Sequence, residues 1–166
     1  NGYHGTETGT TISGTTALVN FANPRALNMP GAADRVSAGD IAAVENQSQL
    51  TWAFWLYQTS YQEHGHYLSK ADPNLQTAMS WAIFNEPSSW LGSQDDIAVY
   101  INPTITDDWA TALCISQAAN ITLGQWMHVA VVFDGTKTGN SNRLKLYTNG
   151  VSRDFEIGCN GTVPAE

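Results

Sequence analysis

The feature that most constrains the fold is a series of short apolar stretches, each about five to nine residues long and separated by turn signals. They are Ala17 to Phe21, Leu50 to Gln58, Ala78 to Phe84, Ile97 to Ile101, Ala110 to Ile115, Trp126 to Asp134, Leu144 to Thr148 and Val151 to Ile157. Such spacing is typical of a β-sandwich or jelly roll. The 166 residues suit a single domain. The sequence therefore predicts an all-β fold, an antiparallel β-sandwich.

The Asn149-Gly150 dipeptide predicts the most specific local structure in the chain. A two-residue type I′ hairpin turn prefers this pair because both of its central positions take a positive φ. The turn fixes a register in which Thr148 lies opposite Val151 and Leu146 lies opposite Arg153. One face of the hairpin is then apolar, as a half-buried strand pair requires, and only Arg153 interrupts it.

Two of the apolar stretches, residues 50–57 and 126–133, carry apolar side chains in both parities. A strand that alternates cleanly has one solvated face, and neither of these has a face that looks fully solvated. We expect them to be central strands of two packed sheets. One side would lie in the core, and the other would be covered by loops or would line a concave groove.

Charge excludes some partners. The chain has 15 acidic and 7 basic residues, for a net charge of -8, and none of the basic residues lies between Ala71 and Thr136. An acidic surface repels phosphate and sulfate backbones, so nucleic acid is excluded as a partner.

The chain has no run of about 18 apolar residues, and we expect no membrane insertion. Charged residues make up 13% against about 25% in an average protein, which is typical of secreted β proteins.

The acidic stretch contains two neighbouring carboxylates, Asp95 and Asp96. Carboxylate oxygens are ligands that Ca²⁺ prefers, so these residues are candidate ligands for a calcium ion. The alternative is that they are solvated loop acids.

The chain has two cysteines, Cys114 and Cys159. They are too few for a disulfide framework, but their even number in a lysine-poor chain is compatible with one bridge. Both fall in segments adjacent to the predicted strands around Trp126 and Asn149-Gly150. They could approach to the Cα separation of about 5 to 6 Å that a disulfide requires. The sequence leaves open whether they form this bridge or remain thiols.

Several segments resemble one family. Gly124 to Gly135 and Leu144 to Gly150 closely resemble the "GxWhHvAvvyDG … lxLYvNG" pair of the laminin G-like, concanavalin A-like jelly rolls. Further segments are similar to other motifs of that family: Asn1 to Thr6, Ala26 to Val36, Leu50 to Leu56 and Tyr67 to Lys70. The resemblance implies a concanavalin A-like jelly roll in which Trp126 and Trp55 are packing residues. It also implies an extracellular location, on a secreted protein or a virion surface. Members mostly bind glycans or proteins, and some cleave glycans.

The resemblance also implies that residues 1–166 form a domain lacking its first and last strands. Family sequences usually begin with a strand before the turn in which Asn1 lies, and they continue with two strands after the hairpin. These end strands are neighbours in a sheet, and an open sheet edge with unpaired backbone groups is costly. We expect a continuation of the polypeptide, or a strand from a neighbouring subunit, to fill the gap. The alternative is that Thr10 to Phe21 folds back as the closing strand.

The six Trp and six Tyr residues exceed what one core of this size needs, so some are expected to face a ligand. Trp55 and Tyr57 share a parity, and Trp90 lies in a polar segment close to Glu86. An aromatic ring beside carboxylates and amides suits an uncharged sugar, because the sugar's CH face packs on the ring and its hydroxyls reach the polar groups. Trp90, Glu86, Trp55 and Tyr57 are therefore candidate glycan-binding residues. The alternative for Trp90 is that it caps the edge of the sandwich.

Two motifs suggest catalysis or metal binding only weakly. The tripeptide Asn85-Glu86-Pro87 has the sequence that carries the acid/base glutamate in several retaining glycosidases, where it stands at the end of a barrel strand. Those enzymes also require a second carboxylate about 5 Å away. We therefore expect no enzymatic activity. His64-Gly65-His66 lacks a third ligand nearby and is interpreted as a solvated loop. His128 resembles a histidine of the family and is expected to make a structural hydrogen bond.

Two functions follow from these observations. The first is a non-enzymatic extracellular recognition module that binds a neutral glycan or a partner protein. The alternative is a structural subunit of a surface fibre, a virion decoration or a cell-surface layer. The native oligomeric state separates them, because an assembly subunit should elute in large complexes.

Overall fold

The computed structural model describes residues 5–13, 25–31, 33–62, 65–71, 79–86, 95–101, 112–116, 119–153, 159–161 and 163–164. The chain divides into two compact units, residues 1–46 and residues 47–166. The prediction that residues 1–166 form one domain lacking its first and last strands stays a prediction. The predicted strand Ala17 to Phe21 lies outside the described residues.

The first unit contains short antiparallel strand pairs. Its elements are β1 (Thr6–Thr8), β2 (Thr11–Ser13), β3 (Ala26–Asn28), β4 (Arg35–Ser37) and the 3-10 turn η1 (Ala42–Val44). β1 pairs with β4, and β2 pairs with β3. Gly9, with φ of 71°, follows β1. This positive φ favours glycine, and a Cβ atom at this position would also meet the carboxyl group of Asp34.

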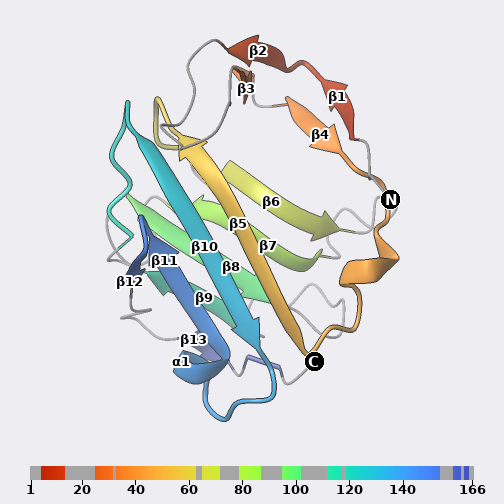
Figure 1. Cartoon of the computed structure of the whole chain (residues 1–166), viewed down its shortest axis with the longest axis vertical. Helices are drawn as coiled ribbons and strands as arrows, with labels where there is room; N and C mark the ends of the chain where they lie inside the picture. Colours follow the sequence, from red (N-terminus) through yellow and green to blue (C-terminus); the bar gives the residue numbers. More distant parts are fainter. Residues whose placement is uncertain are drawn as a thin grey trace. The chain divides into compact units, whose positions relative to one another are not determined.

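The second unit consists of two antiparallel sheets. Its elements are β5 (Gln49–Tyr57), β6 (Gly65–Ala71), β7 (Met79–Glu86), β8 (Asp96–Ile101), β9 (Ala112–Ser116), β10 (Trp126–Asp134), α1 (Asn140–Arg143), β11 (Leu144–Thr148), β12 (Val151–Arg153) and β13 (Cys159–Gly161). One sheet has the order β12-β11-β10-β5 and the other the order β13-β9-β8-β7-β6 (Figure 1). The predicted all-β fold, an antiparallel β-sandwich, is confirmed.

The predicted hairpin is confirmed residue by residue. Asn149 and Gly150 have φ angles of 51° and 78°, and β11 pairs with β12 with Thr148 opposite Val151 and Leu146 opposite Arg153. Arg153 shares the buried face of Leu146, where its Nε donates a hydrogen bond to Thr148 Oγ1 at 2.6 Å. This bond accommodates the charged residue that interrupts the apolar pattern.

The expectation that both stretches are central strands is confirmed for residues 126–133 and is wrong for residues 50–57 among the described strands. They belong to β5 and β10, which pair with each other in one sheet from Trp126 opposite Tyr57 to Asp134 opposite Gln49. Among the described strands, β5 stands at the end of this sheet. Apolar residues in both parities indicate that both faces carry apolar side chains, but they do not indicate which strand is the partner.

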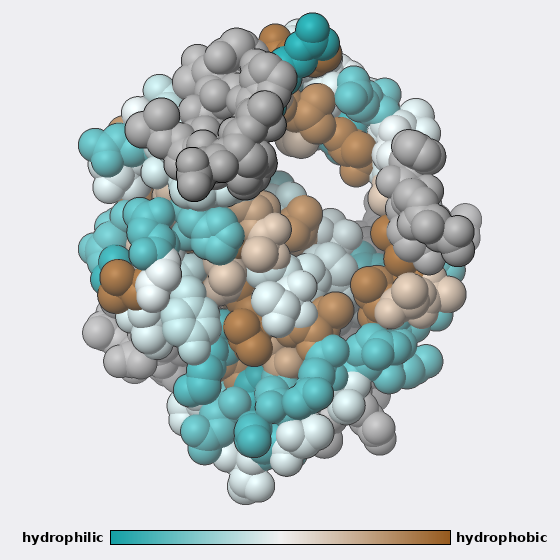
Figure 2. Space-filling view, in the orientation of Figure 1, coloured by the Kyte–Doolittle hydropathy of each residue, from teal (hydrophilic) through white to brown (hydrophobic). Residues whose placement is uncertain are grey.

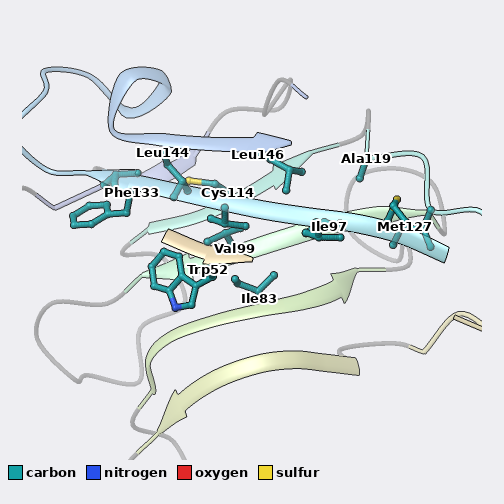
Figure 3. Close-up of a cluster of buried hydrophobic side chains, with 14 residues drawn as sticks. Trp52, Ile83, Ile97, Val99, Cys114, Ala119, Met127, Phe133, Leu144 and Leu146 are labelled. Carbon is teal, nitrogen blue, oxygen red and sulfur yellow. The ribbon is translucent and has the colours of Figure 1, made fainter. Parts of the chain in front are cut away.

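The core lies between the two sheets (Figure 3). Buried side chains on the inner face of the four-stranded sheet meet buried side chains of β7, β8 and β9: Trp52, Met127, Val129, Val131, Phe133, Leu144 and Leu146 on one side, and Ile83, Ile97, Val99 and Cys114 on the other. The rings of Trp52 and Trp81 lie 5.0 Å apart and connect β5 to β7 across the sandwich. This apolar contact holds the two sheets together.

Cys114 is fully buried in this core and is disulfide-bonded. The chain's other cysteine, Cys159, is directly opposite it in the pairing of β9 with β13. The bridge therefore joins two neighbouring strands of the five-stranded sheet.

Candidate functional site

The outer face of the four-stranded sheet carries a group of rings. Side chains on β10 alternate between buried and half-buried, so one face points into the core and the other points away from it. On the outer face, Tyr57 lies opposite Trp126 and Trp55 lies opposite His128. We call these four residues the aromatic platform. Trp55 is 41% exposed and Tyr57 is 40% exposed, so their rings are accessible to a ligand.

The rings of the platform form two cross-strand pairs. The ring centroids of Trp55 and His128 lie 5.3 Å apart with planes at 68°, and those of Tyr57 and Trp126 lie 5.4 Å apart with planes at 55°. Such tilted geometries are favourable for aromatic pairs. Because each pair joins two hydrogen-bonded strands, the backbone ladder fixes the positions of the rings before any ligand arrives.

Small side chains continue the outer face beyond the platform. Ala53 and Ala130 are directly opposite each other, and Tyr147 lies opposite Ala130 on the next strand. In Figure 2, apolar residues in brown lie among paler ones, above a band of hydrophilic residues in teal. The rings therefore lie next to small, uncharged side chains on the same face of the sheet.

His128 differs from the sequence-based expectation. Its backbone N–H donates to Asn149 Oδ1 at 2.9 Å, and its carbonyl oxygen accepts a hydrogen bond from Asn149 N at 2.8 Å. Its imidazole makes no hydrogen bond to the described part of the chain and contacts the ring of Trp55 instead. The expected structural hydrogen bond involves the His128 backbone and not its ring.

A buried network of amide groups fixes the end of β5 that carries the platform. Gln58 follows Tyr57 directly, and its Nε2 donates to Asn85 Oδ1 at 3.0 Å. The hydroxyl of Tyr67 donates to Gln58 Oε1 at 2.5 Å. The carbonyl oxygen of Gln58 accepts from Gly124 N at 2.8 Å. The network thus connects β5 with β6, β7 and the loop before β10.

Asn85 is at the centre of this network. Its Oδ1 also accepts from the backbone N–H of Gln62 at 3.0 Å, and its Nδ2 donates to the carbonyl oxygen of Asp96 at 3.0 Å. Asn85 is 1% exposed. The asparagine of the Asn85-Glu86-Pro87 motif therefore satisfies buried backbone and side-chain groups, which is a structural role.

The remaining candidate residues lie elsewhere. Glu86 ends β7 in the five-stranded sheet, directly opposite Asp96, so it is not in the sheet that holds Trp55 and Tyr57. The side chain of Glu86 and the whole of Trp90 lie outside the described residues. Asp96 is 1% exposed within β8, so its interpretation as a solvated loop acid is wrong. Asp95 is half-buried.

The histidine motif is also partly in a strand. His66 belongs to β6, and its ring lies 5.5 Å from that of Phe84, so a loop is wrong for this residue. His64 lies outside the described residues. Within the described ranges, no three His, Cys, Asp or Glu side chains gather where a metal ion could bind. Calcium binding at Asp95 and Asp96 stays a prediction.

Sequence reasoning identified Trp55 and Tyr57 but missed Trp126 and His128 as their neighbours. The resemblance assigned packing roles to Trp55 and Trp126, and the 41% exposure of Trp55 contradicts that role. The sequence pattern that could have identified Trp126 and His128 is their alternation with the apolar residues of the same stretch, which places them on the face opposite the core. Only the pairing of β5 with β10 brings the four rings together.

We expect the buried phenol of Tyr67 to make stability fall at high pH. Burial raises the pKa of Tyr67, a hydrogen bond to Gln58 lowers it, and nearby Tyr61 raises it, with a net upward shift. A raised folded-state pKa means that the unfolded chain loses its proton first, from about pH 10. The free energy of unfolding should fall as the pH rises above about 10, and this slope should be smaller in Tyr67→Phe. Denaturant unfolding at several alkaline pH values measures it, and equal slopes would contradict the assignment.

Comparison with known proteins adds one match. A family model described as the concanavalin A-like lectin/glucanases superfamily matches residues 30–161, a range that includes every strand from β4 to β13. Neither the curated proteins nor the solved structures gave a match. Among the described residues, no helix has the length and apolar character needed to cross a membrane.

Proposed function

The chain belongs to the concanavalin A-like lectin/glucanase superfamily, and from this premise we propose that it is a non-enzymatic extracellular recognition module. We propose further that it binds a neutral glycan on the aromatic platform formed by Trp55, Tyr57, Trp126 and His128.

The observation that carries the proposal is the exposure of Trp55 and Tyr57 on a fixed sheet face. A sugar packs its CH face on an aromatic ring, and the polar groups around the ring receive its hydroxyls. The strand ladder holds the rings in place, so little conformational freedom is lost on binding. The net charge of -8 favours a neutral sugar over an anionic one.

The superfamily name covers glucanases as well as lectins, so catalysis is the competing function. Glycoside hydrolysis needs two carboxylates beside the sugar that is cleaved. The acidic residues Glu86 and Asp96 belong to strands of the five-stranded sheet and not to the sheet that carries the platform. Asn85, the first residue of the glycosidase-like motif, is engaged in the buried network. These positions support binding without cleavage.

The disulfide at Cys114 supports an extracellular location. Disulfides form and persist in oxidising compartments and are rare in the cytosol. The low proportion of charged residues, 13%, agrees with a secreted β protein.

The test is a glycan array of neutral oligosaccharides at millimolar concentration, run with and without Ca²⁺. We expect binding, and we expect Trp55→Ala and Tyr57→Ala each to weaken it by about tenfold, because each removes an aromatic contact and its buried area. Val151→Ala is the matched control. Val151 is an exposed apolar residue of the same sheet, but it pairs with the buried Thr148 and not with the platform.

A flat array counts against the glycan-binding function, and elution of the native protein in large complexes would favour the structural-subunit alternative. Binding that survives both ring substitutions would place the glycan away from the platform. A calcium requirement that Asp95→Asn and Asp96→Asn abolish would support the predicted ion.

A further inference from the structure

We propose that His128 is the hydrogen-bonding residue of the aromatic platform, where its imidazole contacts a hydroxyl group of a neutral sugar that packs on Trp55. This inference rests on the proposed function and specifies which side chain supplies the polar contact at that site.

The geometry of the pair gives the two rings different tasks. The planes of Trp55 and His128 stand at 68° to each other, so they cannot both lie flat against one sugar ring. Trp55 is the larger ring and is 41% exposed, which suits it to supply the stacking face. His128 then lies beside the bound sugar rather than beneath it, at the edge where hydroxyl groups project.

The imidazole has unused hydrogen-bonding capacity. A neutral imidazole has one N–H donor and one nitrogen acceptor, and neither is engaged within the described part of the chain. His128 is only half-buried, so its ring is within reach of a ligand on this face. A sugar hydroxyl both donates and accepts, so it can satisfy either nitrogen.

Asn149 positions His128 for this contact. The side-chain oxygen of Asn149 holds the His128 backbone N–H at 2.9 Å, and the Asn149 backbone N–H holds the His128 carbonyl at 2.8 Å. Two hydrogen bonds to one peptide segment fix the backbone from which the imidazole projects. The turn that requires Asn149 and Gly150 thus also anchors the platform.

The surroundings of His128 favour an uncharged partner. The described residues opposite and diagonal to it on the outer face are Trp55, Tyr57 and Ala53 on β5, with Asn149 and Tyr147 on its other side. None of these side chains is a carboxylate or an ammonium group. Among the residues that the structure describes on this face, Lys145 and Asp134 are charged, and they lie toward the other end of the sheet, opposite Val132 and Gln49 respectively. A ligand on His128 therefore meets hydrogen-bonding groups and rings.

The experiment compares His128→Phe and His128→Gln, with the oligosaccharide that binds tightest on the array as the probe. His128→Phe retains a ring against Trp55 but loses both nitrogens, and we expect it to weaken binding by about three- to tenfold, the effect of one hydrogen bond. His128→Gln restores a donor and an acceptor, so we expect it to recover most of the affinity. Monodeoxy analogues of the probe should lose affinity toward native protein, and one of them should lose none toward His128→Phe.

The outcomes separate this inference from the function on which it rests. A flat array overturns both. Binding that requires Trp55 but is equal in native protein and in His128→Phe overturns the role of His128 alone. If His128→Phe fails to fold, the deoxy analogues are measured with native protein and His128→Gln. The analogue that lacks the contacting hydroxyl should bind both proteins equally. A difference in affinity between the two proteins that every analogue preserves would contradict a contact with His128.

Discussion

Replacing Cys114 and Cys159 by alanine is expected to lower the free energy of unfolding by about 4 kcal/mol. The bridge closes a loop of about 45 residues, and a cross-link of that length removes this much conformational freedom from the unfolded chain. Cys114 is also fully buried in the main core cluster, so the substitution removes packing between the sheets as well. The disulfide is therefore expected to be among the largest single contributions to stability.

Denaturant unfolding of the native protein, the double alanine variant and the reduced protein measures this effect. Reduction of the native chain keeps both cysteine side chains, so it isolates the cross-link from the packing of Cys114. We expect alkylation without reductant to label neither cysteine. Labelling of both thiols, or a loss of less than about 1 kcal/mol on reduction, would overturn the expectation.

The second large effect is expected for Asn85→Ala, which should cost about 3 kcal/mol or more. The substitution removes two buried hydrogen bonds, one from Gln58 Nε2 and one to the carbonyl oxygen of Asp96, and a partly buried one from the backbone N–H of Gln62. Each unsatisfied buried group costs about 1 to 3 kcal/mol. Because Gln58 directly follows Tyr57, loosening of this network should also weaken glycan binding.

Asn85→Asp tests the same network through pH. The aspartate preserves both acceptor contacts, but its ionised form cannot donate to the carbonyl of Asp96, whereas the protonated form can. The pKa of that new carboxyl is therefore expected to be raised in the folded state. The variant should be most stable below about pH 4, its unfolded-state pKa, and should lose stability as the pH rises. Glu86→Gln is the matched control in the next residue of β7. A small loss in Asn85→Ala, or a loss as large in Glu86→Gln, would count against the network.

Local sequence chemistry predicted part of the fold accurately. Asn149-Gly150 fixed the β11–β12 register because the turn needs two positive φ angles at adjacent positions, and that requirement involves no distant residue. The bounds of β10 and β11 follow similarly from turn residues at their ends. The partnership of β5 with β10 was not predictable in this way, because it joins residues about 70 to 85 positions apart and the apolar pattern of each strand suits many partners.

The candidate site shows the same division. Parity identified Trp55 and Tyr57 as sharing one face, and the structure places them together. Glu86 was grouped with them only because a carboxylate beside aromatic rings suits a sugar ligand, and it belongs to the other sheet. Asn85 and Gln58 were not singled out as core residues, because buried amides resemble surface residues until their partners are known.

The long β5–β10 ladder limits how the length of this chain can vary. Side chains alternate along both strands, so if one residue of β5 before Trp52 were deleted and the register before it kept, Trp55 and Tyr57 would turn into the core and Trp52 and Phe54 to the surface. By contrast, the insertion or deletion of a residue in the exposed turn at residues 136–139 leaves every residue pair of the β5–β10 ladder in place. Relatives that retain this surface should therefore differ in length at their turns, while the spacing of rings along β5 and β10 remains constant.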